Sequence, residues 1–283
     1  MSVALVTDST SSLPAELAAA RGITVVPLQV VIGATSYDEG ADGATPELIA
    51  EALRSWTPVS TSRPNPEEML EVYEGLALEG ATEIVSVHLS ADLSGTFESA
   101  QLAAKRASVP VHAVDSRQVG MGSGFAVLAA ADARDAGLDG DKVASAARER
   151  AAATTSLFYV DTLEYLRRGG RMGAAAALLG SALAVKPILK VDHGRIGPFE
   201  RVRTAARALS RLEELAVEAA ADDAVEVAVA HLASPERAGA LAERLSSRLA
   251  EGLGDREVHV GEIGAVLGAH VGPGMVAVVV ARR

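Results

Sequence analysis

The stretch IVSVHLSADLSGTFESAQ, residues 84–101, decides the fold that we expect for this chain. Its apolar, β-branched start predicts a buried strand, a polar loop follows, and Ser94-Gly95-Thr96 restarts the chain as an amphipathic helix. The first turn of a helix presents unpaired N–H groups and the positive end of the helix dipole, so this junction is a candidate anion site. Gly95 lets a ligand approach the backbone, and Ser94 and Thr96 add hydroxyl groups. The alternative is that Ser94 serves only as the helix N-cap.

Composition limits the classes of protein that this chain can belong to. The 283 residues are long enough for two domains, and 49% apolar with 22% charged residues indicates a globular protein. The net charge of −11 argues against nonspecific binding of nucleic acid or anionic membranes. The absence of Cys excludes disulfides, thiolate chemistry and Cys-based zinc sites. We see no signal peptide, and the longest apolar stretch, Ala174–Val185, is too short to span a bilayer, so we expect a cytoplasmic location.

The first half of the chain repeats a strand, a polar loop and a helix about five times, with strands expected near residues 3–6, 23–32, 57–62, 84–87 and 111–115. Such alternation predicts a parallel sheet with helices on both faces. Ligands of these sheets bind at the carboxyl ends of the strands. Four hydroxyl-bearing loops are expected on that edge: 7–12, 61–62, 90–96 and 115–116.

The pattern changes near residue 154. Two strand patterns flank His193-Gly194, which predicts a hairpin, and strands and helices then follow in α+β order. Ala174–Val185 is almost uncharged and predicts a helix buried on all sides. We therefore expect a Rossmann-like N-terminal α/β domain over residues 1–154, with a parallel sheet flanked by helices. An α+β domain with a mixed or antiparallel sheet is expected over residues 155–283.

Several short segments together resemble the DegV family of bacterial lipid-binding proteins, in order and over nearly the whole chain. They are VTDSTSSLP (6–14), TSRPNP (61–66), HLSADLSGTFESA (88–100), DS (115–116), LEYLRRGGRMG (163–173), KPIL (186–189), VRT (202–204) and GAHVGPG (268–274). The chain departs from the usual TS-x-PS pattern by carrying Asn65, with Arg63 at the variable position.

The resemblance implies a function and a set of site residues. The family is similar to the fatty-acid-binding subunit of bacterial fatty acid kinase, a non-catalytic carrier. Such a protein holds one long-chain fatty acid in an internal tunnel and presents its carboxyl to a separate kinase subunit for acyl-phosphate formation. The resemblance implies a ligand between or within the two domains and no cofactor. Thr61, Ser62, Ser94, Gly95, Thr96 and His270 would bind the carboxyl, and Arg171 and Arg203 would meet the kinase subunit.

The residues themselves leave other interpretations open. Ser94 with His270 as base, and Asp92 or Asp115 as orienter, would make a serine hydrolase, although no Gly-x-Ser-x-Gly motif surrounds Ser94. A small polyol or sugar phosphate could use the same loops. The sequence contains no Gly-x-x-x-x-Gly-Lys-[Ser/Thr] loop and no His/Asp/Glu spacing typical of a metal site, so we expect neither a nucleotide site of that kind nor a metal site. Candidates for the tunnel wall are 120–130, 174–185, Ile188 and 263–267.

Overall fold

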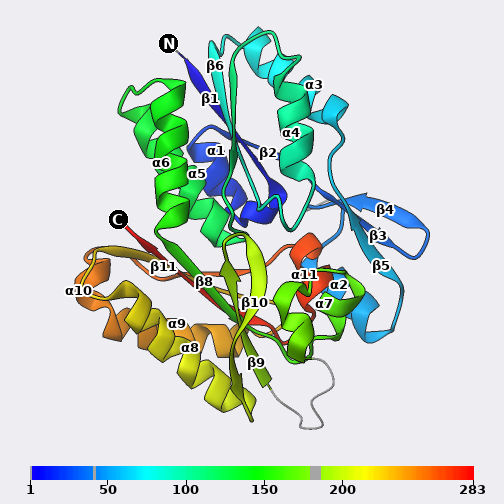
Figure 1. Ribbon diagram of the computed structural model, residues 1–283, viewed down its shortest axis with the longest axis vertical. Helices are drawn as coiled ribbons and strands as arrows, with labels where there is room; N and C mark the ends of the chain where they lie inside the picture. Colours follow the sequence, from blue (N-terminus) through cyan, green and yellow to red (C-terminus); the bar gives the residue numbers. More distant parts are fainter. Residues whose placement is uncertain (1, 41–42, 179–185) are drawn as a thin grey trace.

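The structure, a computed structural model, describes residues 2–40, 43–178 and 186–283 (Figure 1). It contains a four-stranded, a six-stranded and a three-stranded sheet. Figure 1 shows the four-stranded sheet at the top, the six-stranded sheet below it, and the three-stranded sheet at one side. No helix within the described parts of the chain is both long enough and apolar enough to cross a membrane.

The four-stranded sheet is parallel, in the order β2-β1-β6-β7, as the sequence predicts. Alternate residues of β1 face opposite sides: Val3 and Leu5 pack with α5 and α6, and Val6 packs with α3. Because both faces are covered, its strands are nearly continuous apolar runs. The elements are β1 (Val3–Asp8), β2 (Ile23–Val26), β6 (Glu83–His88) and β7 (Val111–Asp115), with α1 (Ala15–Ala20), α3 (Pro66–Leu78), α4 (Thr96–Ala104), α5 (Met121–Asp135), α6 (Gly140–Ala152) and the short 3-10 helix η1 (Ser9–Ser11).

The six-stranded sheet is mixed, in the order β10-β9-β8-β13-β11-β12, which confirms the expected mixed or antiparallel sheet. All its neighbours are antiparallel except β11 and β12. The predicted hairpin joins β9 to β10, and His193 and Gly194 both take the positive φ that a tight hairpin turn requires. The elements are β8 (Thr154–Tyr159), β9 (Lys186–Asp192), β10 (Arg195–Val202), β11 (Val225–His231), β12 (His259–Glu262), β13 (Val276–Arg282), α7 (Glu164–Arg168), α8 (Ala205–Ala220), α9 (Pro235–Arg248), α10 (Ala250–Leu253) and α11 (Ala265–Val271).

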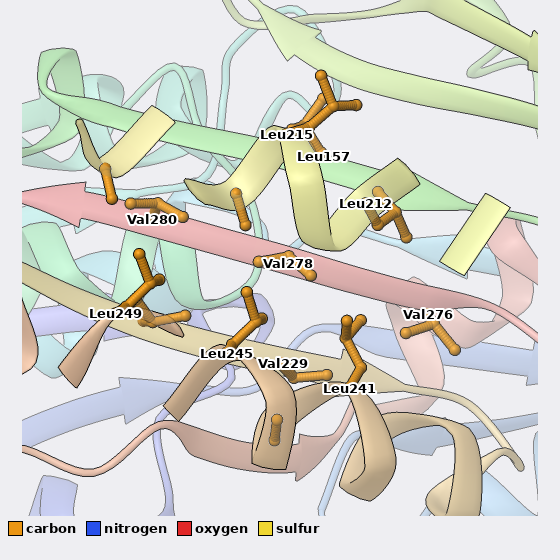
Figure 2. Close-up of a cluster of buried hydrophobic side chains, with 14 of the residues drawn as sticks. Leu157, Leu212, Leu215, Val229, Leu241, Leu245, Leu249, Val276, Val278 and Val280 are labelled. Carbon is orange, nitrogen blue, oxygen red and sulfur yellow. The ribbon is translucent and has the colours of Figure 1, made fainter. Parts of the chain in front are cut away.

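One face of the six-stranded sheet is filled by two helices. Val276, Val278 and Val280 of β13 point toward α8 and α9, where Leu212 and Leu241 meet them in a buried cluster (Figure 2). The intervening residues of β13 point to the opposite face, where Val279 and Ala281 pack against Met121 and Phe125 of α5, and Ala277 lies with the residues around the cavity. This second face forms one wall of the cavity discussed below.

The three-stranded sheet corrects one expectation. Residues 57–62 were expected to add a strand to the parallel sheet, but β5 (Val59–Ser62) pairs antiparallel with β3 (Gln29–Ile32), which also pairs with β4 (Thr35–Asp38). The physical reason is visible in Val59-Ser60-Thr61-Ser62, whose alternate residues are exposed, whereas a strand buried on both faces needs an apolar run. Pro27 separates β2 from β3, and α2 (Pro46–Arg54) lies between β4 and β5.

Two expectations about apolar segments are also wrong. The described part of 174–185 belongs to a 3-10 helix, η2 (Gly173–Leu178), in which Ala174 and Ala176 are exposed, so this part is not buried on all sides. Alanine has too little apolar area to enforce burial. Residues 179–185 lie outside the described residues. Ile188 points into the cluster against α8 and α9, not into a tunnel wall.

A buried carboxylate joins the ends of β1 and β6. Asp8 accepts hydrogen bonds from the Thr10 N–H (3.1 Å), the Thr10 hydroxyl, His88 Nδ1 (2.9 Å) and the Leu89 N–H (3.1 Å). The Tyr73 hydroxyl donates to Ser86 Oγ (2.8 Å), which lies 2.7 Å from His88 Nε2. All five side chains are fully buried or nearly so, and burial raises the pKa of Tyr73 to about 12, which keeps it a donor. Asp8 therefore fixes the start of the loop that carries Ser94.

Replacing Asp8 with Ala should destabilise the protein by about 3 kcal/mol, because Thr10, His88 and Leu89 would keep buried donors without an acceptor. The measurement is the free energy of unfolding in urea. The control is Asp132→Ala, which removes an exposed partner of Arg21 and should cost less than about 1 kcal/mol. Equal losses in the two variants would show that the buried network does not hold this junction.

Candidate functional site

A cavity of about 410 Å³ lies between the open face of the six-stranded sheet, α11, the end of β5 and the loop after β6. Its volume is within the usual range of small-molecule pockets, about 300–1,000 Å³. Of the 27 residues in its wall, 18 are apolar. The apolar wall is formed by Leu28, Leu89, Leu93, Val119, Met121, Leu157, Phe158, Leu166, Val191, Ile196, Ala230, Ile263, Val266, Leu267, Val271, Met275, Ala277 and Val279.

Most of the polar wall is the set predicted to bind a head group. Thr61, Ser62, Ser94, Gly95 and His270 all line the cavity, although they come from three separate segments. Thr61 Oγ1 lies 3.0 Å from His270 Nε2, so β5 and the end of α11 meet directly. Their grouping gives an otherwise apolar cavity one hydroxyl-rich region.

Thr96 does not line the cavity. It is fully buried behind Ser94, and the two hydroxyl oxygens are 2.9 Å apart. The N-cap of α4 is Gly95 rather than Ser94, which lies one residue earlier and accepts a long hydrogen bond from the Thr96 N–H (3.3 Å). Ser94 is therefore not a conventional N-cap, and its hydroxyl borders the cavity instead.

His270 is held neutral by its surroundings. Burial, together with the positive charge of Arg171, lowers its pKa to about 4. A neutral imidazole carries one N–H. His270 Nδ1 is buried with no partner among the described residues, and an unpaired lone pair costs less than an unpaired N–H. We therefore assign the proton to Nε2, which donates to Thr61 and leaves the Thr61 hydroxyl proton free to donate to a ligand.

The two predicted docking arginines do not lie together. Arg171 lines the cavity and donates to the carbonyl oxygens of Gly169 (2.6 Å) and Leu93 (3.2 Å). Arg203 is exposed and follows the end of β10, outside the cavity wall. Gly173, two residues after Arg171, lies against Ile196 near the start of β10, whereas Arg203 follows the other end of that strand. Most of the length of β10, roughly 20 Å, therefore separates the two arginines.

The geometry does not assemble the hydrolase that the sequence left open. Asp92 pairs with Arg195 (2.8 Å), and Asp115 accepts from the Ala91 and Arg117 N–H groups, so neither carboxylate orients His270. An Asp–His–Ser chain does occur at Asp8, His88 and Ser86, but these residues are fully buried and do not line the cavity. We therefore interpret this chain as structural. The sequence analysis missed this chain, and the polar ends of two apolar strands were the available signal, because a buried His needs partners.

Arg63 is a rim residue that the sequence analysis did not assign to the site. Its Nη1 donates to the Gly95 carbonyl (2.9 Å) and to Glu98 (2.8 Å), and its half-exposed side chain lines the cavity. A Cβ on Gly95 would lie 1.6 Å from this nitrogen, so only a glycine at position 95 allows the Arg63 guanidinium to lie across the backbone there. Arg63 thus narrows the opening beside Ser94.

The described residues contain no group of three or more His, Asp or Glu side chains placed to hold a metal ion. The chemistry available at the cavity is therefore hydrogen bonding by hydroxyls and a neutral imidazole, with two guanidinium groups nearby. This set suits one small polar or anionic group at the end of an apolar ligand.

The two domains and the cavity define a class of α/β proteins with an apolar cavity and a small polar mouth. The chain belongs to the DegV family, whose model, described as an uncharacterised protein of that family, matches residues 2–283. A DegV domain-containing protein of Streptomyces coelicolor is 54% identical over 281 residues, covering 99% of each chain.

Solved structures extend the similarity to the whole fold. The chain resembles a DegV family protein from Thermus thermophilus, described by its fatty acid binding, with a TM-score of 0.92, 34% identity and full coverage of both chains. It also resembles DegV from Bacillus subtilis, described as a fatty acid binding protein, with a TM-score of 0.91, 33% identity and full coverage of both.

The lowered pKa of His270 predicts a dependence of stability on pH. Between about pH 6.5 and pH 4 the unfolded state binds the proton that folded His270 refuses, so the free energy of unfolding should fall as the pH falls. At pH 5 this effect lowers the free energy of unfolding by about 2 kcal/mol relative to pH 7.5. His270→Gln should remove the effect, so the free energy of unfolding of the ligand-free protein, measured in urea, should change less between pH 7.5 and pH 5.

The control is Thr61→Val, which removes the same hydrogen bond but keeps the titrating ring, and should retain the wild-type slope. If the stability of His270→Gln falls with decreasing pH as steeply as that of the wild type, His270 is not the source of this pH dependence.

Arg63 should slow entry into the cavity. A neutral fluorescent probe such as Nile red should bind the ligand-free Arg63→Ala variant several-fold faster, and Gly95→Ala should have a similar effect because its Cβ displaces the guanidinium. The double variant should be no faster than Arg63→Ala alone, since both changes act on one contact. Arg106→Ala, which breaks an exposed pair with Glu67, is the control, and stopped-flow rates unchanged in all variants would exclude this role.

Proposed function

We propose that this protein binds one long-chain fatty acid in the cavity, with the carboxyl at Thr61, Ser62, Ser94 and Gly95 and with His270 beside it. Thr96 supports Ser94 from behind. The observation that carries the proposal is the combination of an apolar cavity with one hydroxyl-rich end. DegV relatives of the same fold that are described as fatty-acid-binding support it.

The energetics favour a long acyl chain over a polar ligand. About 14 methylenes at ~0.8 kcal/mol each would supply roughly 11 kcal/mol of gross transfer free energy. Part of this is lost to association and ordering, and each hydrogen bond to the charged carboxylate adds only about 1.5–3 kcal/mol. A small polyol or sugar phosphate would leave most of the apolar wall without contacts. The tail therefore sets affinity, and the hydroxyls set orientation.

We further propose that the protein is a carrier rather than an enzyme, and that it presents the carboxyl to a separate kinase subunit for acyl-phosphate formation in the cytoplasm. The exposed carboxyl end supports presentation, and Arg171 and Arg203 are the proposed docking residues. Their separation requires a partner whose surface spans both. The proposal retains a domain boundary near residue 154, with the ligand between the two domains.

Native mass spectrometry before and after denaturing extraction tests the binding proposal. The purified protein should carry the excess mass of about one fatty acid, released as a free acid. Ala277→Leu should shift the bound acids toward shorter chains by about two to three methylenes, because Ala277 faces the cavity from near the start of β13. Ala206→Leu, on the exposed side of α8, is the control.

A protein of bare mass that also takes up no added palmitic acid would overturn the proposal. An unchanged chain-length distribution in Ala277→Leu would place the tail elsewhere.

A further inference from the structure

A second pocket, of about 400 Å³, lies behind the loop that follows α11. It is bordered by the end of α2, the residue Asp161 after β8, the start of α9, and Pro273-Gly274. Figure 1 shows α2, α7 and α11 grouped at this side of the six-stranded sheet. In contrast to the apolar cavity, its wall consists mainly of charged residues, serine and backbone.

The start of α9 presents unused hydrogen-bond donors to this pocket. Ser234 occupies the N-cap position of this 14-residue helix but its side chain does not cap it, and Pro235 follows at the first position. Within residues 2–40, 43–178 and 186–283, no acceptor pairs with the N–H groups of Glu236 and Arg237. The helix dipole makes this end favourable for negative charge.

Ser234 is an independent sign of a missing ligand. The residue lines the pocket although it is only 6% exposed, and its hydroxyl makes no hydrogen bond to any described residue. Its oxygen is not sealed off from solvent, so the pocket is the side from which a partner can reach this nearly buried residue. An N-cap serine would ordinarily turn to its own helix, so this hydroxyl is available to an external acceptor.

Two guanidinium groups border the same pocket. Arg54, at the end of α2, forms no ion pair with any described residue, and Arg237 lies 3.7 Å from Asp161. Asp161 is already neutralised by Lys186 at 3.2 Å and accepts from the Tyr159 hydroxyl, whereas Glu236 is exposed at the rim. With Lys186 counted, three cationic groups face two carboxylates at this pocket, in a protein whose net charge is −11.

We propose that this pocket binds a phosphate group, either inorganic phosphate or a phosphate monoester. The Ser234 hydroxyl and the N–H groups of Glu236 and Arg237 would donate to its oxygens, and Arg54 and Arg237 would pair with its charge. A tetrahedral dianion can accept all of these hydrogen bonds at once, and one guanidinium group can donate two parallel hydrogen bonds to two phosphate oxygens. Ser234, which now lacks a partner, would gain one.

The site shares a segment with the apolar cavity but does not depend on what the cavity holds. Pro273 and Gly274 line the phosphate pocket, and Val271 and Met275, on either side of them, line the cavity. Gly274 has φ +92°, and a Cβ there would lie 2.0 Å from Asp161, so the segment packs tightly between the two sites. The phosphate proposal can therefore fail or succeed independently of fatty-acid binding.

Isothermal titration with inorganic phosphate at pH 7.5, compared with chloride at equal ionic strength, tests the proposal. We expect saturable binding by the wild-type protein, at least tenfold weaker in the double variant Arg54→Gln/Arg237→Gln, and several-fold weaker in Ser234→Ala. Arg248→Gln, at the opposite end of α9, should bind as wild type does. Because Ser234 does not cap the helix, Ser234→Ala should unfold at the wild-type temperature.

Glycerol phosphate and acetyl phosphate distinguish the source of the group. Tighter binding of either compound identifies a phosphorylated metabolite, an ester in the first case and an acyl phosphate in the second, and tighter binding of inorganic phosphate identifies the free ion. The absence of phosphate-specific heat, or equal affinity in wild type and the double variant, would overturn the proposal.

Discussion

The cavity exists because the central strands of the six-stranded sheet alternate large and small side chains. In β11 and β13 most valines point toward α8 and α9, while Val279 and the alanines Ala230 and Ala277, which pair across the two strands, point the other way. The valine face binds the helices and supplies the buried area that holds the C-terminal half together. The alanine face is too small to fill the space below α11. The same period-2 pattern thus produces the core on one side and the cavity on the other.

The polar mouth depends on a different principle, the meeting of segments that are distant in the chain. β5 supplies Thr61, the loop after β6 supplies Ser94, and the end of α11 supplies His270. Two of these segments are held from behind: the β6 loop by Asp8, and α11 by Glu39, which accepts from the Val266 N–H at 2.7 Å. Burial raises the pKa of Glu39, so its hydrogen bond to α11 only partly offsets the desolvation of the carboxyl group. Both supports are buried side chains.

The sequence predicted the classes of the two larger sheets, since both follow from hydrophobic periodicity and from the βα alternation. It placed β5 in the wrong sheet, because a strand of four residues with one apolar side chain carries little information about its partners. It proposed Thr61, Ser62, Ser94, Gly95 and His270 as head-group residues through the family resemblance, not through geometry, and all five line the cavity. Arg63 was missed because its importance depends on a close approach to Gly95, which lies 32 residues away. Contacts of this kind cannot be read from local patterns.

The charge state of the mouth determines what kind of binding is possible there. A buried cation would hold a carboxylate strongly, and it would also oppose any reaction that uses the carboxylate as a nucleophile, because ion pairing lowers its reactivity. Here the buried member, His270, is neutral, and Arg171 is occupied by two carbonyl groups. A carboxylate at the mouth would be oriented by hydroxyl donors and would keep much of its negative charge. In the proposed complex the apolar tail would supply most of the binding free energy, so the head group could be held weakly without loss of the ligand. This division separates affinity from reactivity, as a carrier that hands its ligand to a second protein requires.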